Sequence, residues 1–307
     1  MPLAAGAVAR RSGLVKKDIS KSVMGFSWLA LEPFVIVTAF WSLDLSQVAD
    51  LAAAPIIGTS WMLAMLIPAA IVASRLGLSH PRRGNFYLAT MFSNTGITLG
   101  ACLCMILLDD KGLDMALLFT LGFMPLLLTV GFGIGKHSAR KAALAEGSSI
   151  VNPPSLGLLR LVPYSAIAVG VILNLAGART PALAPYIARR LVFADVVLYS
   201  FAIGTLFMFG SVRRFLRECI VMSGLKFIVG PLVGLGLFFI VSQVAGLSRL
   251  LLQVTIVQCA MPVAIMSVVV SRFCRLDMQL AAACWVFTTL AVAAVVPILA
   301  YVVPLLA

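Results

Sequence analysis

Two long apolar runs of the sequence are interrupted near their centres by small or helix-breaking residues. The tetrapeptide SNTG, residues 93–96, interrupts the run 85–108, and the tripeptide AMP, residues 260–262, interrupts the run 250–271. Proline has no backbone N–H and its ring disfavours a continuous helix. Glycine tolerates unusual dihedral angles, and an asparagine side chain can replace lost backbone hydrogen bonds. Each interruption therefore predicts a helix that is broken near its middle.

The composition of the chain places these broken helices in a membrane. Hydrophobic residues make up 62% of the 307 residues, charged residues only 11%, and the mean hydropathy is +1.09. Soluble domains carry roughly 25% charged residues, so this chain could not cover its core with a polar surface. The sequence therefore predicts an integral membrane protein, which excludes a cytosolic enzyme, a disordered protein and a secreted disulfide scaffold.

The apolar runs predict nine membrane spans. About 20 residues cross the hydrocarbon core, and runs of this length lie at about 22–43, 52–73, 85–108, 115–135, 155–176, 191–210, 219–241, 250–271 and 279–304. Sixteen of the 23 Lys and Arg residues fall in one set of alternate loops and five in the other. Because basic loops stay in the cytoplasm, we expect a multi-pass protein of the plasma or inner membrane with a cytoplasmic N-terminus. The same clusters explain the net charge of +12 without nucleic-acid binding, since they lie between apolar runs.

The two broken runs are predicted to cross the membrane in opposite directions. Corresponding helices of two halves then form an inverted repeat, and matched breaks at one depth indicate a binding site near the bilayer midplane. A single proline or glycine would indicate only a kink. We predict an all-α integral membrane bundle with two broken crossover helices, divided into a cytoplasmic N-terminal segment, a first repeat, a cytoplasmic linker and a second repeat: 1–21, 22–136, 137–154 and 155–307.

The candidate site consists of the residues of the two breaks and one neighbour on the same helix face. Gln258 precedes Pro262 by four residues, so the two share a face. We expect Asn94, Thr95 and Gly96 to meet Met261 and Pro262 near the bilayer midplane, because equal depth and opposite direction bring the two breaks together. The predicted substrate-binding residues are Asn94, Thr95, Gly96, Gln258, Met261 and Pro262.

Charged residues inside the spans are candidates for ion coupling. Glu32 lies well inside a span and is predicted to couple protons or to line the pathway; an aqueous vestibule or a basic neighbour explains it equally well. Asp195 is a second coupling candidate, although Arg189 and Arg190 just upstream favour an interfacial ion pair. Lys226 is expected to extend to the headgroups rather than to bind an anion.

The spans contain no histidine and no paired acid/base or metal-binding constellation. The two histidines, His80 and His137, fall in basic loops, the six cysteines form no Cys-x-x-Cys pair, and the sequence has no P-loop motif. We therefore predict no metal site, no cofactor and no enzymatic activity.

These motifs resemble the auxin efflux carrier family of membrane transporters, which shares its crossover architecture with the bile acid–sodium symporters. SNTG at 93–96 and AMPVA at 260–264 are similar to the family's signatures on the two crossover helices. NPP at 152–154, the small residues at 201–206 and the basic segment 6–14 are similar to further family segments. The chain departs from the family pattern at 97–101, which lacks a proline, and in having nine predicted spans where the family has ten.

The resemblance implies a secondary active transporter of a small organic anion that works by alternating access in the lipid bilayer. A mobile part, about 52–135 and 219–304, would move against a scaffold, about 22–43 and 155–210. H+ or Na+ would be the coupling ion, and the protein would act as a monomer or as a homodimer. A transport-inactive membrane scaffold or sensor derived from the same fold is the alternative. The substrate, the coupling ion and the direction of transport stay open.

Overall fold

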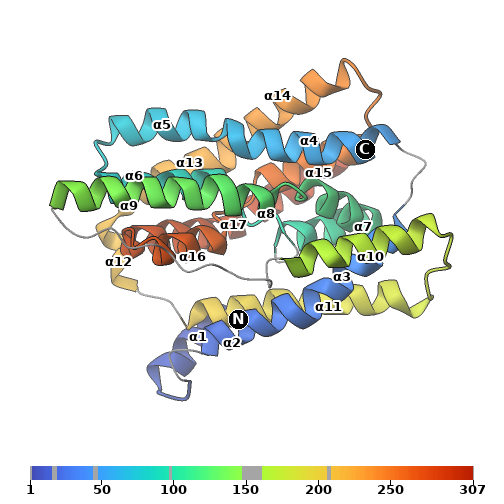
Figure 1. Ribbon diagram of the computed structural model, residues 1–307, viewed down its shortest axis with the longest axis horizontal. Helices are drawn as coiled ribbons and strands as arrows, with labels where there is room; N and C mark the ends of the chain where they lie inside the picture. The colour runs from blue at the N-terminus through green and yellow to red at the C-terminus, as the bar shows by residue number, and fades with distance from the viewer. Residues whose placement is uncertain are drawn as a thin grey trace. The chain divides into compact units, whose positions relative to one another are not determined.

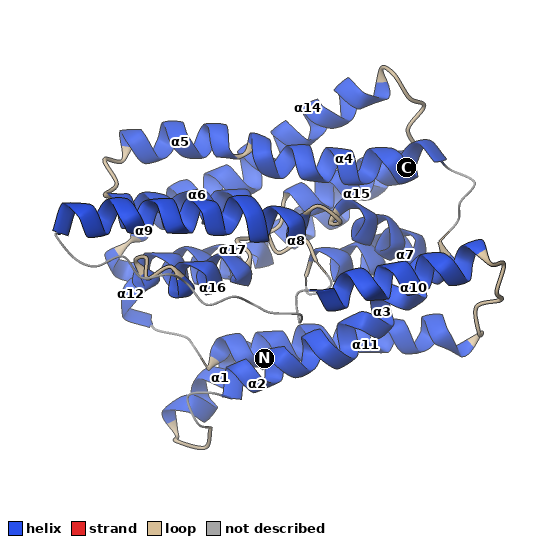
Figure 2. Ribbon diagram, in the orientation of Figure 1, coloured by secondary structure: helices blue, strands red, loops and turns tan. Residues whose placement is uncertain are grey.

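The computed structural model describes residues 2–15, 19–43, 48–96, 99–146, 161–205 and 209–306. Within these ranges the chain is helical apart from turns, short loops and one isolated antiparallel β-bridge between Ser93 and Val263 (Figure 2). The NPP motif at 152–154, Arg160, residues 97–98 and the predicted linker beyond residue 146 lie outside the described residues.

Four helical segments of the described chain are long and apolar enough to cross a membrane: Ala49–Arg75, Gly100–Ala145, Leu216–Ser242 and Met278–Leu305. Shorter apolar helices lie at Leu29–Ser42, Val162–Leu175 and Arg249–Cys259. The segment Gly100–Ala145 is not one straight helix, because Asp109 has a φ of 60° and kinks it. This architecture fits a multi-pass, all-helical integral membrane protein, while the number of nine spans stays a prediction.

The chain forms two compact units. Unit 1 comprises Met1–Gln47, Gly96–Leu117 and Leu156–Phe207, and unit 2 comprises Val48–Thr95, Leu118–Ser155 and Met208–Ala307. Unit 1 contains the segments predicted as scaffold, and unit 2 contains most of those predicted as mobile. The exception is 96–117, which was predicted with the mobile part and belongs to unit 1.

Unit 1 is built around two close helix pairs. Its described helices are α1 (Pro2–Arg11), α2 (Ile19–Phe26), the π-helical turn η1 (Ser27–Leu31), α3 (Glu32–Ser42), most of α7 (Gly100–Phe119), α10 (Val162–Leu175) and α11 (Leu183–Gly204) (Figure 1). α10 packs on α3, where Gly170 lets the backbones approach and the Asn174 amide lies 2.8–3.1 Å from three carbonyls at the end of α3. α1 packs on α11, with Gly6 against the Phe201 carbonyl. The predicted N-terminal segment 1–21 therefore contains a docked helix.

Unit 2 holds the remaining described helices: α4 (Val48–Ala64), α5 (Leu66–Arg75), α6 (His80–Met91), α8 (Phe123–Leu126), η2 (Leu127–Gly131), α9 (Phe132–Glu146), α12 (Phe209–Arg214), α13 (Leu216–Gly224), η4 (Leu225–Val229), α14 (Gly230–Ser242), α15 (Arg249–Cys259), α16 (Ile265–Phe273) and α17 (Met278–Leu305). Glycines bring several of them close together, as at Gly84 against Ser138 and Gly234 against Cys259. α9 extends to Glu146, so residues 137–146 of the predicted linker are helical.

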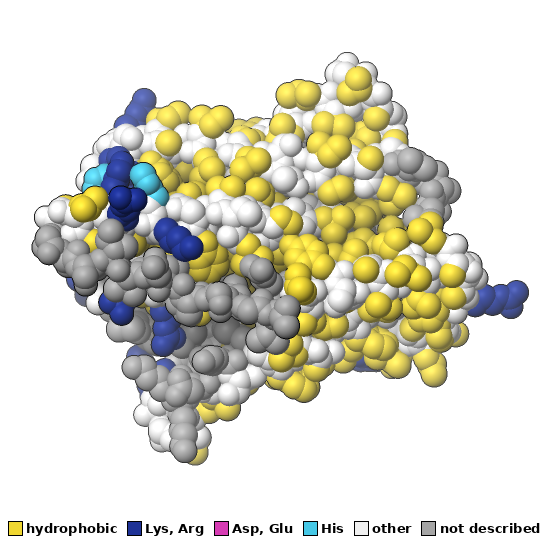
Figure 3. All heavy atoms as spheres, in the orientation of Figure 1, with side chains coloured by type: hydrophobic (Ala, Val, Ile, Leu, Met, Phe, Trp, Pro, Cys, Tyr) yellow, Lys and Arg dark blue, Asp and Glu magenta, His cyan; other side chains and the backbone are white. Residues whose placement is uncertain are grey.

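Large hydrophobic side chains lie exposed on the outer helices of unit 2. They include Ile56, Ile67 and Ile71 on α4 and α5, and Leu232 and Ile240 on α14. Figure 3 shows hydrophobic side chains over these helices, while Lys, Arg and His side chains gather where α9 ends and the loop between α5 and α6 lies. Such an exposed apolar surface is what contact with lipid tails requires.

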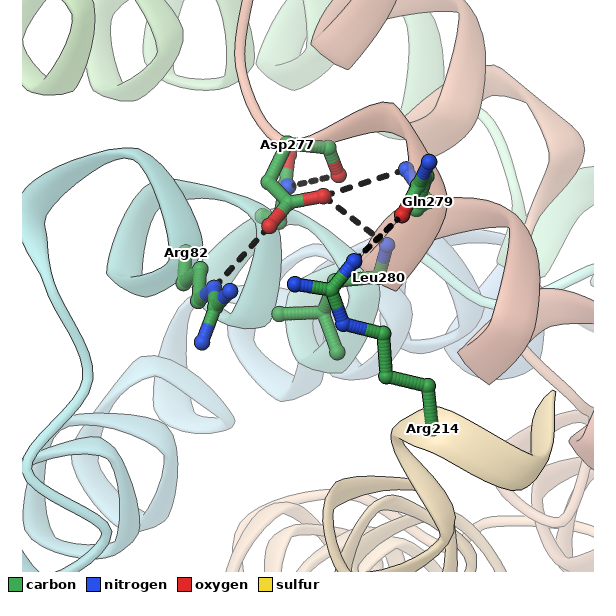
Figure 4. A network of polar contacts seen from close by, with 6 residues as sticks. Arg82, Arg214, Asp277, Gln279 and Leu280 are labelled. Atoms are coloured by element: carbon green, nitrogen blue, oxygen red, sulfur yellow. Dashed lines mark hydrogen bonds and ion pairs between the residues drawn. The ribbon is translucent and has the colours of Figure 1, made fainter. Parts of the chain in front are cut away.

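A polar network joins three basic segments of unit 2 that were predicted to be cytoplasmic. The Arg82 guanidinium donates to the Asp277 carboxylate over 2.9 Å, and Asp277 also caps α17 by accepting from the N–H groups of Gln279 and Leu280 (Figure 4). Arg214 donates to the Gln279 side chain over 3.1 Å. The starts of α6 and α17 and the end of α12 therefore lie together, as one shared membrane side requires.

Candidate transport site

The two predicted helix breaks of unit 2 lie against each other. α6 ends at Met91, α15 ends at Cys259, and α16 begins at Ile265. The Asn94 N–H donates to the Pro262 carbonyl over 2.7 Å, and the Ala264 N–H donates to the Phe92 carbonyl over 3.0 Å. The prediction that Asn94 contacts Pro262 is thus confirmed, whereas a role of these residues in binding stays a prediction.

Each break supplies hydrogen-bond partners for the other. Breaking a helix leaves backbone N–H and C=O groups without partners, which costs several kcal/mol for each group in hydrocarbon. Here the strand-like pairing of residues 92–94 with residues 262–264 satisfies four of these groups. The Val263 N–H faces the other way and donates to the Thr288 hydroxyl of α17 over 3.2 Å. The crossing is therefore held together by hydrogen bonds within unit 2.

The other candidate residues lie beside this crossing in unit 2, except for Gly96. Thr95, Gln258, Met261 and Pro262 are buried and Asn94 is half-buried. The Met261 N–H donates to the Gln258 carbonyl over 3.3 Å, so Gln258 belongs to the last turn before the break. Gly96 is the first residue of the 96–117 segment of unit 1. The hydrogen bonds between the two breaks join residues 92–94 to residues 262–264, and both segments belong to unit 2.

Lys226 reaches this crossing, contrary to the prediction that it extends to the headgroups. Its side chain is 0% exposed. The ammonium Nζ donates to the Thr90 carbonyl over 2.7 Å, the Phe92 carbonyl over 3.2 Å and the Ser93 hydroxyl over 2.8 Å. The Trp61 ring centroid lies 6.0 Å away, within the range of a cation–π contact. Lys226 therefore belongs to the first break.

Unit 1 brings together the two predicted coupling residues, Glu32 and Asp195. The Tyr199 hydroxyl donates to the Glu32 carboxyl over 2.7 Å, and the Ser27 hydroxyl donates to the Asp195 carboxyl. The two carboxyls are close enough to interact electrostatically. Asp195 is 0% exposed, and its second oxygen, Oδ2, has no hydrogen-bond partner among the described residues.

A π-helical turn explains why these four side chains meet. The Glu32 N–H donates to the Ser27 carbonyl, five residues back, so η1 places Ser27 and Glu32 one turn apart. In a regular α-helix they would point about 140° apart. Asp195 and Tyr199 are four residues apart on α11 and therefore share its face. Two matched faces thus form the acid cluster Ser27, Glu32, Asp195 and Tyr199.

The arginines that precede Asp195 do not pair with it. Arg189 donates to the Asp110 carboxylate over 2.9 Å and lies 3.7 Å from Asp109, and Arg190 donates to the Tyr186 hydroxyl over 3.1 Å. The predicted interfacial ion pair of Asp195 is therefore wrong. The arginines instead line an open pocket of unit 1 of about 540 Å³, together with Asp110, Pro185, Tyr186 and Phe193. In the described part of the chain, no group of three or more His, Cys, Asp or Glu side chains could hold a metal ion.

Comparison with known proteins points to membrane transport. No protein-family model matches the chain. Over 258 residues the chain is 26% identical to an uncharacterized transporter of Methanothermobacter thermautotrophicus, an alignment that covers 84% of this chain and 80% of the relative. The similarity to a transporter thus extends over most of both chains.

Proposed function

We propose that the protein is a secondary active transporter of a small organic anion in the cell membrane, with the crossing in unit 2 as its substrate site. The observation that carries the proposal is the pair of hydrogen bonds that joins residues 92–94 to residues 262–264 between broken apolar helices. Non-helical backbone at membrane depth is tolerated only where it is buried in protein or lines a water-filled cavity. Transporters use such discontinuous helices to bind their substrates.

Three further observations support this function. The similarity to a transporter over 84% of the chain favours transport over a purely structural role. The division into two units separates the crossing from the acid cluster, as a transport part and a scaffold would be separated. The resemblance of both breaks to the auxin efflux carrier signatures favours an organic anion, and the positive end of α16, which begins directly after the second break, would attract its charge.

The acid cluster of unit 1 is the proposed coupling site, and H+ is the proposed ion. Each carboxyl accepts one hydrogen bond from a hydroxyl, and neither of the two forms an ion pair with a basic side chain among the described residues. Charged side chains in hydrocarbon are costly and mark ion pathways. A proton bound by one of the two carboxyls removes one of the cluster's two negative charges without the several oxygen ligands that a metal cation demands.

The test is binding followed by uptake. Purified protein is screened by thermal shift against aliphatic and aromatic monocarboxylates and dicarboxylates, and the best ligand is then offered to proteoliposomes with and without a pH gradient. Asn94→Ala should weaken binding at least about tenfold with little loss of stability, because the main-chain N–H of Asn94 makes the crossing bond. Gln243→Ala, which removes an exposed amide at the end of α14, is the matched control.

Each outcome decides between the alternatives. Uptake by the Gln243→Ala control, together with loss of uptake in Asn94→Ala, supports the transport function. Binding without uptake under any gradient favours the transport-inactive sensor or scaffold. Equal affinity of Asn94→Ala and the control contradicts the placement of the substrate at the crossing.

A further inference from the structure

Lys226 is a buried lysine whose amine hydrogen-bonds only to oxygen atoms that carry no negative charge. Its three partners are the carbonyls of Thr90 and Phe92 and the hydroxyl of Ser93. Among the described residues, no carboxylate lies within ion-pair distance of its Nζ. The only titratable group that interacts with it electrostatically in the described chain is the Cys259 thiol. When the Lys226 amine is protonated, its positive charge is therefore balanced by dipoles alone.

The position of these oxygens explains how dipoles can suffice. α6 ends at Met91, so the carbonyls of Thr90 and Phe92 lie where a helix has no further N–H groups to offer them. The C-terminal end of a helix carries the equivalent of about half a negative charge. Lys226 thus satisfies the Thr90 carbonyl and the second lone pair of the Phe92 carbonyl, which also accepts from the Ala264 N–H, and it lies at the negative end of α6.

A free cation would be bound by the same kind of site. Unwound backbone carbonyls and the C-terminal ends of half-helices coordinate Na+ in ion-coupled transporters, and rings of carbonyl oxygens replace the hydration shell of monovalent cations in channels. Two carbonyls and one hydroxyl around Nζ make a donor set of this class, and the Trp61 face adds to it. The Trp61 ring is held in turn by its own N–H, which donates to the Gly230 carbonyl over 2.9 Å.

The π-helical turn η4 (Leu225–Val229) carries Lys226 into this site. The Gly230 N–H donates to the Leu225 carbonyl, five residues back, so the helix is locally widened at Lys226. Gly230 also lets α14 approach α15, because a Cβ there would lie 2.6 Å from the Cys259 carbonyl. The turn and the close approach place the side chain inside unit 2 instead of toward the lipid.

We propose that the first break contains a monovalent-cation site and that the Lys226 ammonium occupies it permanently as a tethered cation. The break then needs no free Na+ to neutralise the end of α6. The stability consequence stands by itself, whereas Na+-independent uptake, its functional consequence, rests on the proposed transport function.

The test is chemical rescue of stability in purified full-length protein. Lys226→Ala vacates the site, and the melting temperature is measured in the chlorides of methylammonium, ethylammonium, sodium and choline at equal ionic strength. We expect a melting temperature lower by roughly 5–10 °C in choline, with saturable recovery of at least half of the loss in ethylammonium or sodium. Lys111→Ala, which removes an exposed lysine of α7, should show no difference between the salts.

A second variant keeps the proposal falsifiable if Lys226→Ala does not fold. Lys226→Gln keeps two N–H donors and removes the charge, so its melting temperature should lie below that of the wild type in every salt. A Lys226→Gln protein as stable as the wild type would show that the charge is not needed. Equal recovery of Lys226→Ala in all four salts, or none in any, would overturn the cation site.

Because the readout is stability, failure of this test and failure of the transport proposal are distinguishable. If added cations restore the stability of Lys226→Ala but the protein transports no carboxylate, the tethered-cation proposal holds and the transport proposal fails. If the protein transports a carboxylate but no cation restores the stability of Lys226→Ala, the transport proposal holds and the tethered-cation proposal fails.

Discussion

The acid cluster of unit 1 and the crossing of unit 2 both hold charge-bearing groups among apolar helices, but they do so differently. At the crossing, the single ammonium of Lys226 has a hydrogen-bond acceptor for each of its three N–H groups. In the acid cluster, two carboxyls have one hydroxyl donor each, and one oxygen of Asp195 is left without a partner in the described chain. The crossing is therefore saturated and suited to a fixed charge, whereas the acid cluster is unsaturated and suited to an exchangeable proton.

The strongest way to break this comparison is to neutralise each site in turn. Lys226→Met leaves the carbonyls of Thr90 and Phe92 without their lysine donor and should cost about 1–3 kcal/mol of unfolding free energy, as a buried acceptor left without its partner does. Glu32→Gln keeps an oxygen for the Tyr199 hydroxyl and should cost less than about 1 kcal/mol. The measurement is the melting temperature of both purified variants at one pH. Equal losses of melting temperature in the two variants would show that the hydrogen bonding is equally complete at both sites.

The second prediction concerns pH, and it sharpens the comparison because only one site should exchange protons. Uptake by the wild type should vary between roughly pH 5 and pH 8, and Glu32→Gln should remove most of this variation while the protein stays folded. Asp195→Asn should have the same effect, since both carboxyls belong to one cluster and interact. Initial rates in proteoliposomes across this range provide the measurement.

Asp110→Asn is the control for that series. Asp110 is an exposed carboxylate of the same unit, paired with Arg189 at 2.9 Å and outside the acid cluster. Its variant should keep the wild-type pH profile. A pH profile that survives in both Glu32→Gln and Asp195→Asn would leave the cluster with a structural role only.

The crossing could be predicted from the sequence because its cause is local. Helix-breaking residues in two apolar runs, with loop charges that give opposite directions, were enough to bring Asn94 and Pro262 together, and the bond of 2.7 Å confirms their contact. Glu32 and Asp195 were each singled out because ionisable residues in an apolar run are conspicuous, and the structure places both in the acid cluster. Whether they couple ions stays a prediction.

The partners of the buried charges could not be predicted, because they depend on helices far apart in the sequence and on π-helical turns. Lys226 was assigned to the headgroups on the assumption of a regular helix, whereas η4 turns it toward carbonyls 134 and 136 residues away. Ser27 was overlooked because five-residue spacing places it away from Glu32 in an α-helix. The four-residue spacing of Asp195 and Tyr199 shows from the sequence that the two side chains share a face of α11. It identifies their partners only when the helix that packs against this face is known.

The smallest expected effect compares one carboxylate from each unit. Asp277 accepts from Arg82 over 2.9 Å and caps α17 through the N–H groups of Gln279 and Leu280. Its replacement by Ala should cost about 1–2 kcal/mol, since loss of an N-cap alone costs about 1 kcal/mol. Asp110→Ala removes only a solvent-exposed ion pair with Arg189 and should cost less than about 0.5 kcal/mol.

Salt separates the two contributions at Asp277. Surface ion pairs are screened at high ionic strength, whereas a cap formed by two hydrogen bonds to backbone N–H groups is affected much less. The melting temperature of Asp277→Ala should therefore stay below that of the wild type in both low and high salt, while the small deficit of Asp110→Ala should vanish in high salt. If high salt removed both deficits, the contribution of Asp277 would lie in its ion pair with Arg82, and the cap on α17 would add nothing measurable to the stability of unit 2.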